Sequence, residues 1–165
     1  MSKQSAIERA ARAAADFGDA ADAVRQAVAT RLGLNRTDFR ILINLRSGEP
    51  VSAGALAADA GLSPAATTEA VQRLAARGLL VRGTDPHDRR RAVITITPGA
   101  AAELASLFGP ISNDGHALLR GYTTAELELL IGFLEVGRRL QLAGAERMRT
   151  EAPHPARPAG SPASP

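Results

Sequence analysis

The sequence predicts a mainly α-helical fold with one small β-hairpin. Alanine is the commonest residue and aromatic residues make up only 3% of the chain, a composition that favours closely packed helices. Apolar residues recur at spacings of three and four, as on the buried face of a helix. Two β-prone runs, LLVR (79–82) and AVITIT (92–97), flank a polar loop, which is the pattern of a hairpin.

The first predicted helix is roughly 25 residues long and carries one apolar stripe. A helix of this length in a small domain needs a partner for its stripe. Phe17, and Phe39 in the next helix, are expected to be core residues. The stripe consists of Ile7, Ala10, Ala14, Phe17, Ala21, Val24 and Val28.

Two shorter helices should follow. Asn35 is a good N-cap, with Asp38 in the first turn, and the segment 47–50 ends this helix. Val51 fits a very short strand, and Ser52 caps the next helix. Apolar residues expected inside are Phe39, Ile41, Leu42, Leu45, Leu56, Ala57 and Ala60.

A tight turn then leads to a helix over 64–77. Gly61 can take the positive φ that such a turn requires. Ser63 is a good N-cap, and Pro64 suits the first helical position, where no N–H is needed. Gly78 is a natural C-terminal cap.

Beyond the hairpin, Thr97-Pro98 should start a helix through Leu104, Leu107 and Phe108, which Gly109-Pro110 must bend or break. Thr123 with Glu126 forms a capping box that opens a final helix, with Leu127, Leu130, Ile131 and Leu134 on one face. The proline-rich end should be disordered. The expected segments are a long first helix (5–33), a central region of short helices and the hairpin (34–98), further helices (99–150) and the tail (151–165).

Positive charge is concentrated in one window. The chain has a net charge of +3, and residues 63–97 alone carry six arginines against three acidic residues. Localised positive charge of this kind favours a polyanionic partner such as double-stranded DNA.

The order of helix, tight turn, helix and basic hairpin is that of a winged helix-turn-helix. The second helix would present Ala65, Thr68, Glu69 and Gln72 to a major groove. The wing loop (83–92) would reach the minor groove, where a narrow A·T-rich segment attracts arginine.

Residues 56–104 resemble the core of the MarR (multiple antibiotic resistance regulator) family. The matches are RLAARGLLVR (73–82), DRR (88–90) and ITPGAAAEL (96–104), and the long flanking helices fit over nearly all of 5–150. The resemblance implies a homodimer in which the terminal helices, 5–33 and 99–150, interlock as the dimerisation region and residues 34–98 form the DNA-binding domain. It also implies a palindromic operator and, commonly, release by a small organic ligand.

The resemblance also implies roles for single residues. Arg90 would enter the minor groove, held by Asp88 through a bidentate pair, while Arg89 and Arg91 would serve phosphates or the packing of the wing. Ser63 and Pro64 would set the helix N-terminus against a phosphate. The full set of predicted DNA-binding residues is Ser63, Pro64, Ala65, Thr67, Thr68, Glu69, Gln72, Arg73, Asp88, Arg89, Arg90 and Arg91.

Several of these residues admit two interpretations. Arg73 suits a contact to the DNA backbone or bases, or a surface salt bridge with Glu69 one turn earlier. Glu69, where many relatives carry a basic or neutral residue, can accept from a cytosine amino group or face solvent. Thr67 lies where members of the family usually carry a larger aliphatic residue, and its smaller side chain would loosen the packing of the helix. The arginine run by itself also fits a solvated loop.

Other function classes lack support. Cysteine is absent, which excludes disulfides and thiol redox switches. The three histidines, His87, His116 and His154, lack ligand spacing, so no metal is expected. No nucleophile-elbow or phosphate-loop motif occurs, so we expect neither an enzyme nor a cofactor. No apolar run spans a membrane and no secretory signal is evident, so a cytoplasmic protein is expected.

The sequence therefore predicts a homodimeric DNA-binding transcriptional regulator, and a ligand-responsive repressor is the form of it that the resemblance favours. The alternative is a winged-helix adaptor that binds protein rather than DNA. The sequence does not identify the operator, the inducer or the regulated genes.

Overall fold

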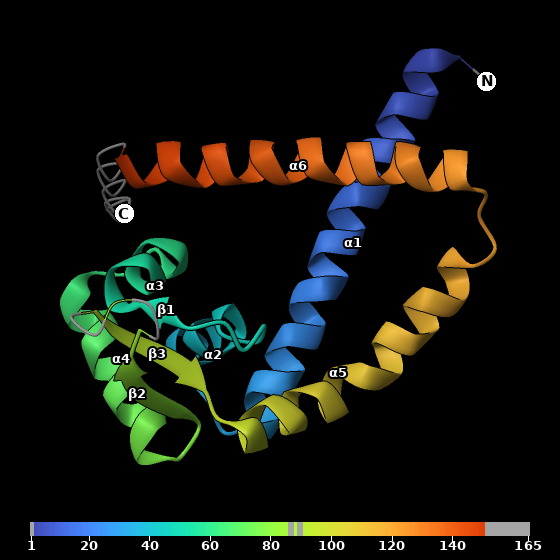
Figure 1. Ribbon diagram of the computed structural model, residues 1–165. Coiled ribbons are helices and arrows are strands. Elements are labelled where there is room, and N and C mark those ends of the chain that lie inside the picture. The colour runs from blue at the N-terminus through green and yellow to red at the C-terminus, as the bar shows by residue number, and fades with distance from the viewer. Residues whose placement is uncertain (1, 86–87, 89–90, 151–165) are drawn as a thin grey trace, which may run out of the picture. The chain divides into compact units, whose positions relative to one another are not determined.

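The computed structural model describes residues 2–85, 88 and 91–150 (Figure 1). The chain divides into two compact units, with the boundary in the sequence between Ile111 and Ser112. The fold is mainly helical with a small antiparallel sheet, as predicted. Its elements are α1 (Lys3–Arg31), α2 (Arg36–Asn44), β1 (Val51–Ser52), α3 (Ala53–Ala60), α4 (Pro64–Ala76), β2 (Leu80–Thr84), β3 (Ala92–Ile96), α5 (Pro98–Leu119) and α6 (Thr124–Thr150).

The core of the first unit joins α2, α3 and α4 to the sheet and to the adjoining ends of α1 and α5. All the apolar residues predicted inside α2, α3 and the turn after α2 are buried. Complete removal of a leucine-sized side chain from water stabilises a fold by about 1.5–3 kcal/mol, so these residues dominate the stability of the unit. The side chains that are 1% exposed or less include Ile41, Leu42, Leu45, Leu56 and Leu74.

Only the C-terminal end of α1 takes part in this core. Val28 and Ala29 are its buried residues. Ile7 is 53% exposed and Phe17 is 71% exposed, so the prediction that Phe17 is a core residue is wrong for the single chain. The physical reason is the length of α1, most of which extends past the elements that cover its last turn.

Side-chain caps begin the short helices where the sequence predicted them. Asn35 Oδ1 accepts from Asp38 N at 2.8 Å, and Ser52 Oγ accepts from Ala55 N at 3.2 Å. Gly61 ends α3 with φ 59°, the left-handed conformation that glycine adopts without a steric penalty. The tight turn that sets α4 against α3 is therefore confirmed.

The sheet has three strands in the order β1-β3-β2. β2 and β3 form the predicted hairpin, with Leu80 opposite Ile96 and Thr84 opposite Ala92. Val51 lies in a two-residue strand, as predicted, and pairs with Ile94 of β3. The pairing joins residues more than forty positions apart, and no local pattern predicts it.

The helix α5 continues through Pro110 to Leu119, so the proline does not break it. Proline removes one backbone hydrogen bond, and the division between the two units lies next to this position. The prediction of disorder for the tail falls on residues 151–165, which lie outside the described residues.

The helix α6 begins with the predicted capping box. Thr123 N donates to Glu126 Oε2 at 2.8 Å, and Glu126 N donates to Thr123 Oγ1 at 3.4 Å. The hydrogen bonds from Thr123 lower the pKa of Glu126. No residue of α6 is buried within the chain. Its exposed large apolar side chains are Leu129, Ile131, Phe133, Leu134, Val136, Leu140, Leu142 and Met148.

Candidate nucleic-acid interface

The helix α4 has one buried face and one exposed face. Thr67, Ala70, Val71 and Leu74 point into the core. On the opposite face every residue predicted to read DNA is exposed: Ala65, Thr68, Glu69 and Gln72. These positions are three and four residues apart, so they form a continuous strip along the helix. An α-helix fits the width of a major groove.

The start of α4 is an exposed helix N-terminus with a side-chain cap. Ser63 Oγ accepts from Ala66 N at 3.2 Å, and Pro64 has no N–H to satisfy. The remaining N–H groups of a first turn have no partner within the helix, and the helix dipole makes this end partly positive. Ser63 and Pro64 are exposed, so a phosphate group can approach the end of the helix.

Two neighbouring threonines have different surroundings. Thr68 is exposed, and its hydroxyl donates to Pro64 O at 2.9 Å, which leaves the oxygen lone pairs and the methyl group for a partner. Thr67 is 1% exposed, and its hydroxyl donates to Ser63 O at 3.0 Å. Its inclusion among the DNA-binding residues is therefore corrected. Thr67 fills a core position and satisfies its hydroxyl within the helix.

Arg73 has a partner that the sequence did not suggest. Its guanidinium donates from Nε to Asp38 Oδ2 at 3.1 Å and from Nη2 to Asp38 Oδ1 at 2.7 Å. The hydrogen bond to Asp38 raises the pKa of Arg73. Glu69 Oε2 lies 3.9 Å from Nη1, so the expected salt bridge within α4 is present as a longer contact. Asp38 belongs to α2, 35 positions away, and only the packing of α2 against α4 brings the two together.

The wing extends the β2–β3 hairpin. Asp85 N donates to Arg91 O at 2.9 Å, and Arg91 N donates to Asp88 O at 2.9 Å, which folds the loop back on itself. Asp88 and Arg91 are both exposed. The predicted minor-groove residue Arg90, and its neighbour Arg89, lie outside the described residues. Arg82 adds another exposed guanidinium group on β2.

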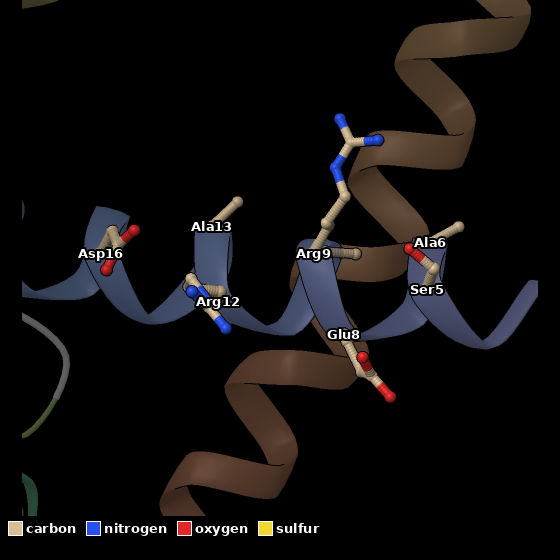
Figure 2. Close-up of a pocket in the computed structure, with 8 residues that line it drawn as sticks. Ser5, Ala6, Glu8, Arg9, Arg12, Ala13 and Asp16 are labelled. Carbon is tan, nitrogen blue, oxygen red and sulfur yellow. The ribbon is translucent and has the colours of Figure 1, made fainter. Parts of the chain in front are cut away.

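A shallow hollow runs along the first half of α1 (Figure 2). All of its lining residues belong to this one helix, and Figure 2 shows Glu8 and Arg9 pointing to opposite sides of it. A surface formed by a single helix encloses nothing, so it does not identify a ligand site. Within the parts of the chain that the structure covers, no group of acidic or histidine residues could hold a metal ion. Over the same residues, no helix is both long and apolar enough to traverse a lipid bilayer.

The chain matches proteins that regulate transcription. Residues 32–91 match the model of the MarR family. The HTH-type transcriptional regulator YcgE of Bacillus subtilis (strain 168) is 36% identical over 124 residues, which cover 75% of this chain and 80% of that protein. The match is longer than the helix-turn-helix and the wing together, so the similarity to YcgE extends into the sequence that flanks them.

Solved structures of other transcriptional regulators are similar to this chain. The transcriptional regulator BldR from Sulfolobus solfataricus is 28% identical with a TM-score of 0.52, covering 84% of this chain and 99% of that one. Wild-type MarR from E. coli is 21% identical with a TM-score of 0.51, covering 76% and 93%, and shows the shared fold. The chain therefore belongs to the MarR family of winged helix-turn-helix transcriptional regulators, which are DNA-binding proteins rather than enzymes.

Proposed function

We propose that this regulator is a homodimeric repressor that places α4 in the major groove and the wing in the adjacent minor groove of a palindromic operator. The observation that carries the proposal is that α4 has an exposed strip and an opposite face that is buried in the core. The strip consists of Ala65, Thr68, Glu69 and Gln72. A helix fixed on one side and polar on the other can present side chains to base edges in a constant register.

The surroundings of the strip support the same docking. The first turn of α4 offers a positive helix end to one phosphate. The hairpin beside it carries Arg82 and Arg91 in addition to the predicted contact residues Arg89 and Arg90. Ser63, Pro64 and Asp88 keep the roles that the resemblance implied for them.

Dimerisation is supported by the exposed apolar residues of α6 and of the first half of α1. A helix without a buried residue on its own chain leaves its apolar side chains in water, at an unfavourable free energy of about 25 cal/mol per Å². Pairing with a second copy would remove this cost. It would also set two copies of α4 about one helical turn of DNA apart, as a palindromic site requires.

The proposal includes release of the DNA by a small organic ligand. A small organic molecule between the dimerisation helices and the winged domain would change the separation of the two α4 helices. For a tenfold loss of DNA affinity, the ligand needs to bind the DNA-free protein only about 1.4 kcal/mol more favourably than the DNA-bound protein. Without such a molecule, the abundance of the protein itself would control occupancy.

The test is fluorescence anisotropy with the duplex upstream of the protein's own gene at several salt concentrations. With about three to five phosphate contacts per subunit, the log–log slope of affinity against salt should be about −6 to −9. A winged-helix adaptor that binds protein predicts no salt-dependent duplex binding. It also predicts that reversing the charges at Arg89, Arg90 and Arg91 has no effect on partner binding.

A further inference from the structure

Two arginines, Arg73 in the last turn of α4 and Arg77 at its C-cap, reach the same part of the chain. Arg73 and Arg77 are four residues apart, so they lie on one side of the helix. Arg73 binds Asp38 near the start of α2, and Arg77 binds the end of α1. Both guanidinium groups therefore hold the short junction between α1 and α2.

Arg77 binds the two carbonyl groups that directly follow the last residue of α1. Its Nη2 donates to Leu32 O at 2.7 Å and its Nη1 donates to Gly33 O at 2.9 Å. Carbonyls at a helix C-terminus lack intrahelical donors and carry partial negative charge, so a cation binds there favourably. Gly33 has φ 61°, which turns the chain so that both carbonyl groups accept from one guanidinium.

Asp38 fixes the other end of the junction. Its side chain is only 8% exposed, and Oδ2 accepts from Asn35 Nδ2 at 3.0 Å as well as from Arg73. The bidentate geometry suits the planar fork of arginine and not the single ammonium group of lysine. A buried carboxylate whose bonds are all satisfied in this way holds Arg73 in one position.

We propose that Arg73 and Arg77 form a clamp that fixes the orientation of α4 relative to α1, and that Arg73 is a positioning residue rather than a DNA ligand. This inference rests on the proposed function, because it assumes that α4 reads DNA and that α1 belongs to the dimer interface. Four charge-assisted hydrogen bonds then transmit the position of the dimerisation helix to the strip that contacts bases.

The side chain of Arg73 is 48% exposed, so a direct phosphate contact is the competing explanation. The two explanations differ for Asp38→Asn. If Arg73 is a DNA ligand, removal of its acidic partner frees the guanidinium, and affinity for DNA is unchanged or rises. If Arg73 belongs to a clamp, the same substitution loosens α4, and affinity falls although Asp38 is buried and cannot touch DNA.

The experiment uses the full chain and a duplex selected from a randomised library with the wild-type protein. Affinity is measured over a range of salt concentrations for wild type, Asp38→Asn, Arg73→Lys, Arg73→Gln and Arg77→Ala, where Arg73→Gln removes the positive charge that Arg73→Lys keeps. We expect each variant to bind about tenfold more weakly, the loss that one charge-assisted hydrogen bond produces. The salt slope should stay at the wild-type value, because no phosphate contact is removed.

A second duplex, with one base pair inserted between the half-sites, tests the coupling to α1. The wild-type protein should discriminate strongly against the insertion. Arg77→Ala should discriminate less, because its α4 helices are no longer held at a fixed separation. Glu103→Gln on α5 makes the same change of net charge as Asp38→Asn at an exposed position outside the clamp, and should stay within about twofold of wild type.

Each other outcome overturns the inference in a distinguishable way. Unchanged or tighter binding by Asp38→Asn would show that Arg73 is a DNA ligand. A replacement at Arg73 or Arg77 that makes the salt slope shallower by about 0.9 per lost contact would show the same of that arginine. An unchanged spacing preference in Arg77→Ala would remove the link to α1. Failure of the wild-type protein to bind any duplex would overturn the proposed function and the clamp together.

Discussion

Thr97 and Gly78, which flank the β2–β3 hairpin, are joined by a hydrogen bond. Thr97 Oγ1 donates to Gly78 O at 2.9 Å, and Thr97 N donates to Leu79 O at 3.0 Å. The same hydroxyl accepts from Ala100 N at 3.3 Å in the first turn of α5. One side chain thus connects the end of α4, the base of the hairpin and the start of the helix that leads out of the unit.

Replacing Thr97 with valine keeps the shape of the side chain and removes both hydroxyl bonds. We expect the free energy of unfolding to fall by about 1–2 kcal/mol, since a helix N-cap and a hydrogen bond are lost together. Urea unfolding followed by circular dichroism measures this change. Thr84→Val, at an exposed position of β2, is the matched control and should alter stability by less than about 0.5 kcal/mol. Equal effects from both substitutions would contradict the structural role of Thr97.

The pKa of Glu126 gives a prediction about pH. Hydrogen bonds from Thr123 lower this pKa, because they stabilise the ionised carboxylate in the folded state. In the unfolded state these hydrogen bonds are absent. The resulting stabilisation is present above the unfolded pKa of glutamate and disappears as pH falls through the lowered value. Hydrogen exchange at the amides of the first turn of α6 should therefore speed up on acidification relative to the middle of the helix. In Glu126→Gln this acid-dependent difference should vanish. Its persistence in the variant would assign the effect to another group.

The wing prediction concerns Arg90. If its guanidinium enters the minor groove, Arg90→Ala should weaken operator binding by about 1–3 kcal/mol in an anisotropy titration. Arg90→Lys separates the possible contacts, because lysine keeps the charge and loses the planar fork. A phosphate contact would be largely restored by lysine, whereas a minor-groove contact would not. Unchanged affinity in Arg90→Ala would remove the wing from the mechanism.

Local features of the structure could be predicted from sequence, while contacts between distant segments could not. The N-caps at Asn35, Ser52 and Ser63 and the left-handed turn at Gly61 depend on residues within four positions. The pairing of Val51 with Ile94 depends on packing between distant segments. Helical periodicity predicts which residues form the exposed strip of α4. It does not predict that Arg73, beside this strip, binds Asp38 of α2.

Phe17 and Arg73 show what a local sequence pattern leaves out. The sequence marks Phe17 as apolar and therefore as core, but it does not say whether the core belongs to one chain or to a pair. For Arg73 the sequence suggests a contact to DNA or a salt bridge with Glu69 on the same helix, and that salt bridge is present. The structure adds Asp38, whose Oδ1 lies 2.7 Å from Arg73 Nη2, closer than the 3.9 Å between Glu69 Oε2 and Nη1.

Dimerisation should depend on the apolar face of α6. In a symmetric pair each residue of the interface occurs twice, so Leu134→Glu would place two carboxylates in an apolar contact. Leu134 is 58% exposed in the single chain, so the substitution leaves the protomer core intact. We expect the dissociation constant of the dimer to rise by about a hundredfold or more, from the loss of two buried leucines at about 1.5–3 kcal/mol each. Sedimentation velocity over a range of protein concentrations measures this shift.

The neighbouring substitution Glu135→Gln is the control for the dimer. Glu135 is exposed and polar, and its replacement should leave the oligomeric state unchanged. The Leu134→Glu monomer should retain its helix content and bind a single half-site as well as one wild-type subunit does. It should lose the gain in affinity that a palindrome gives to two linked subunits. A variant that remains dimeric at micromolar concentration would place the interface on other helices. A monomer with full affinity for the palindrome would show that the two copies of α4 act independently.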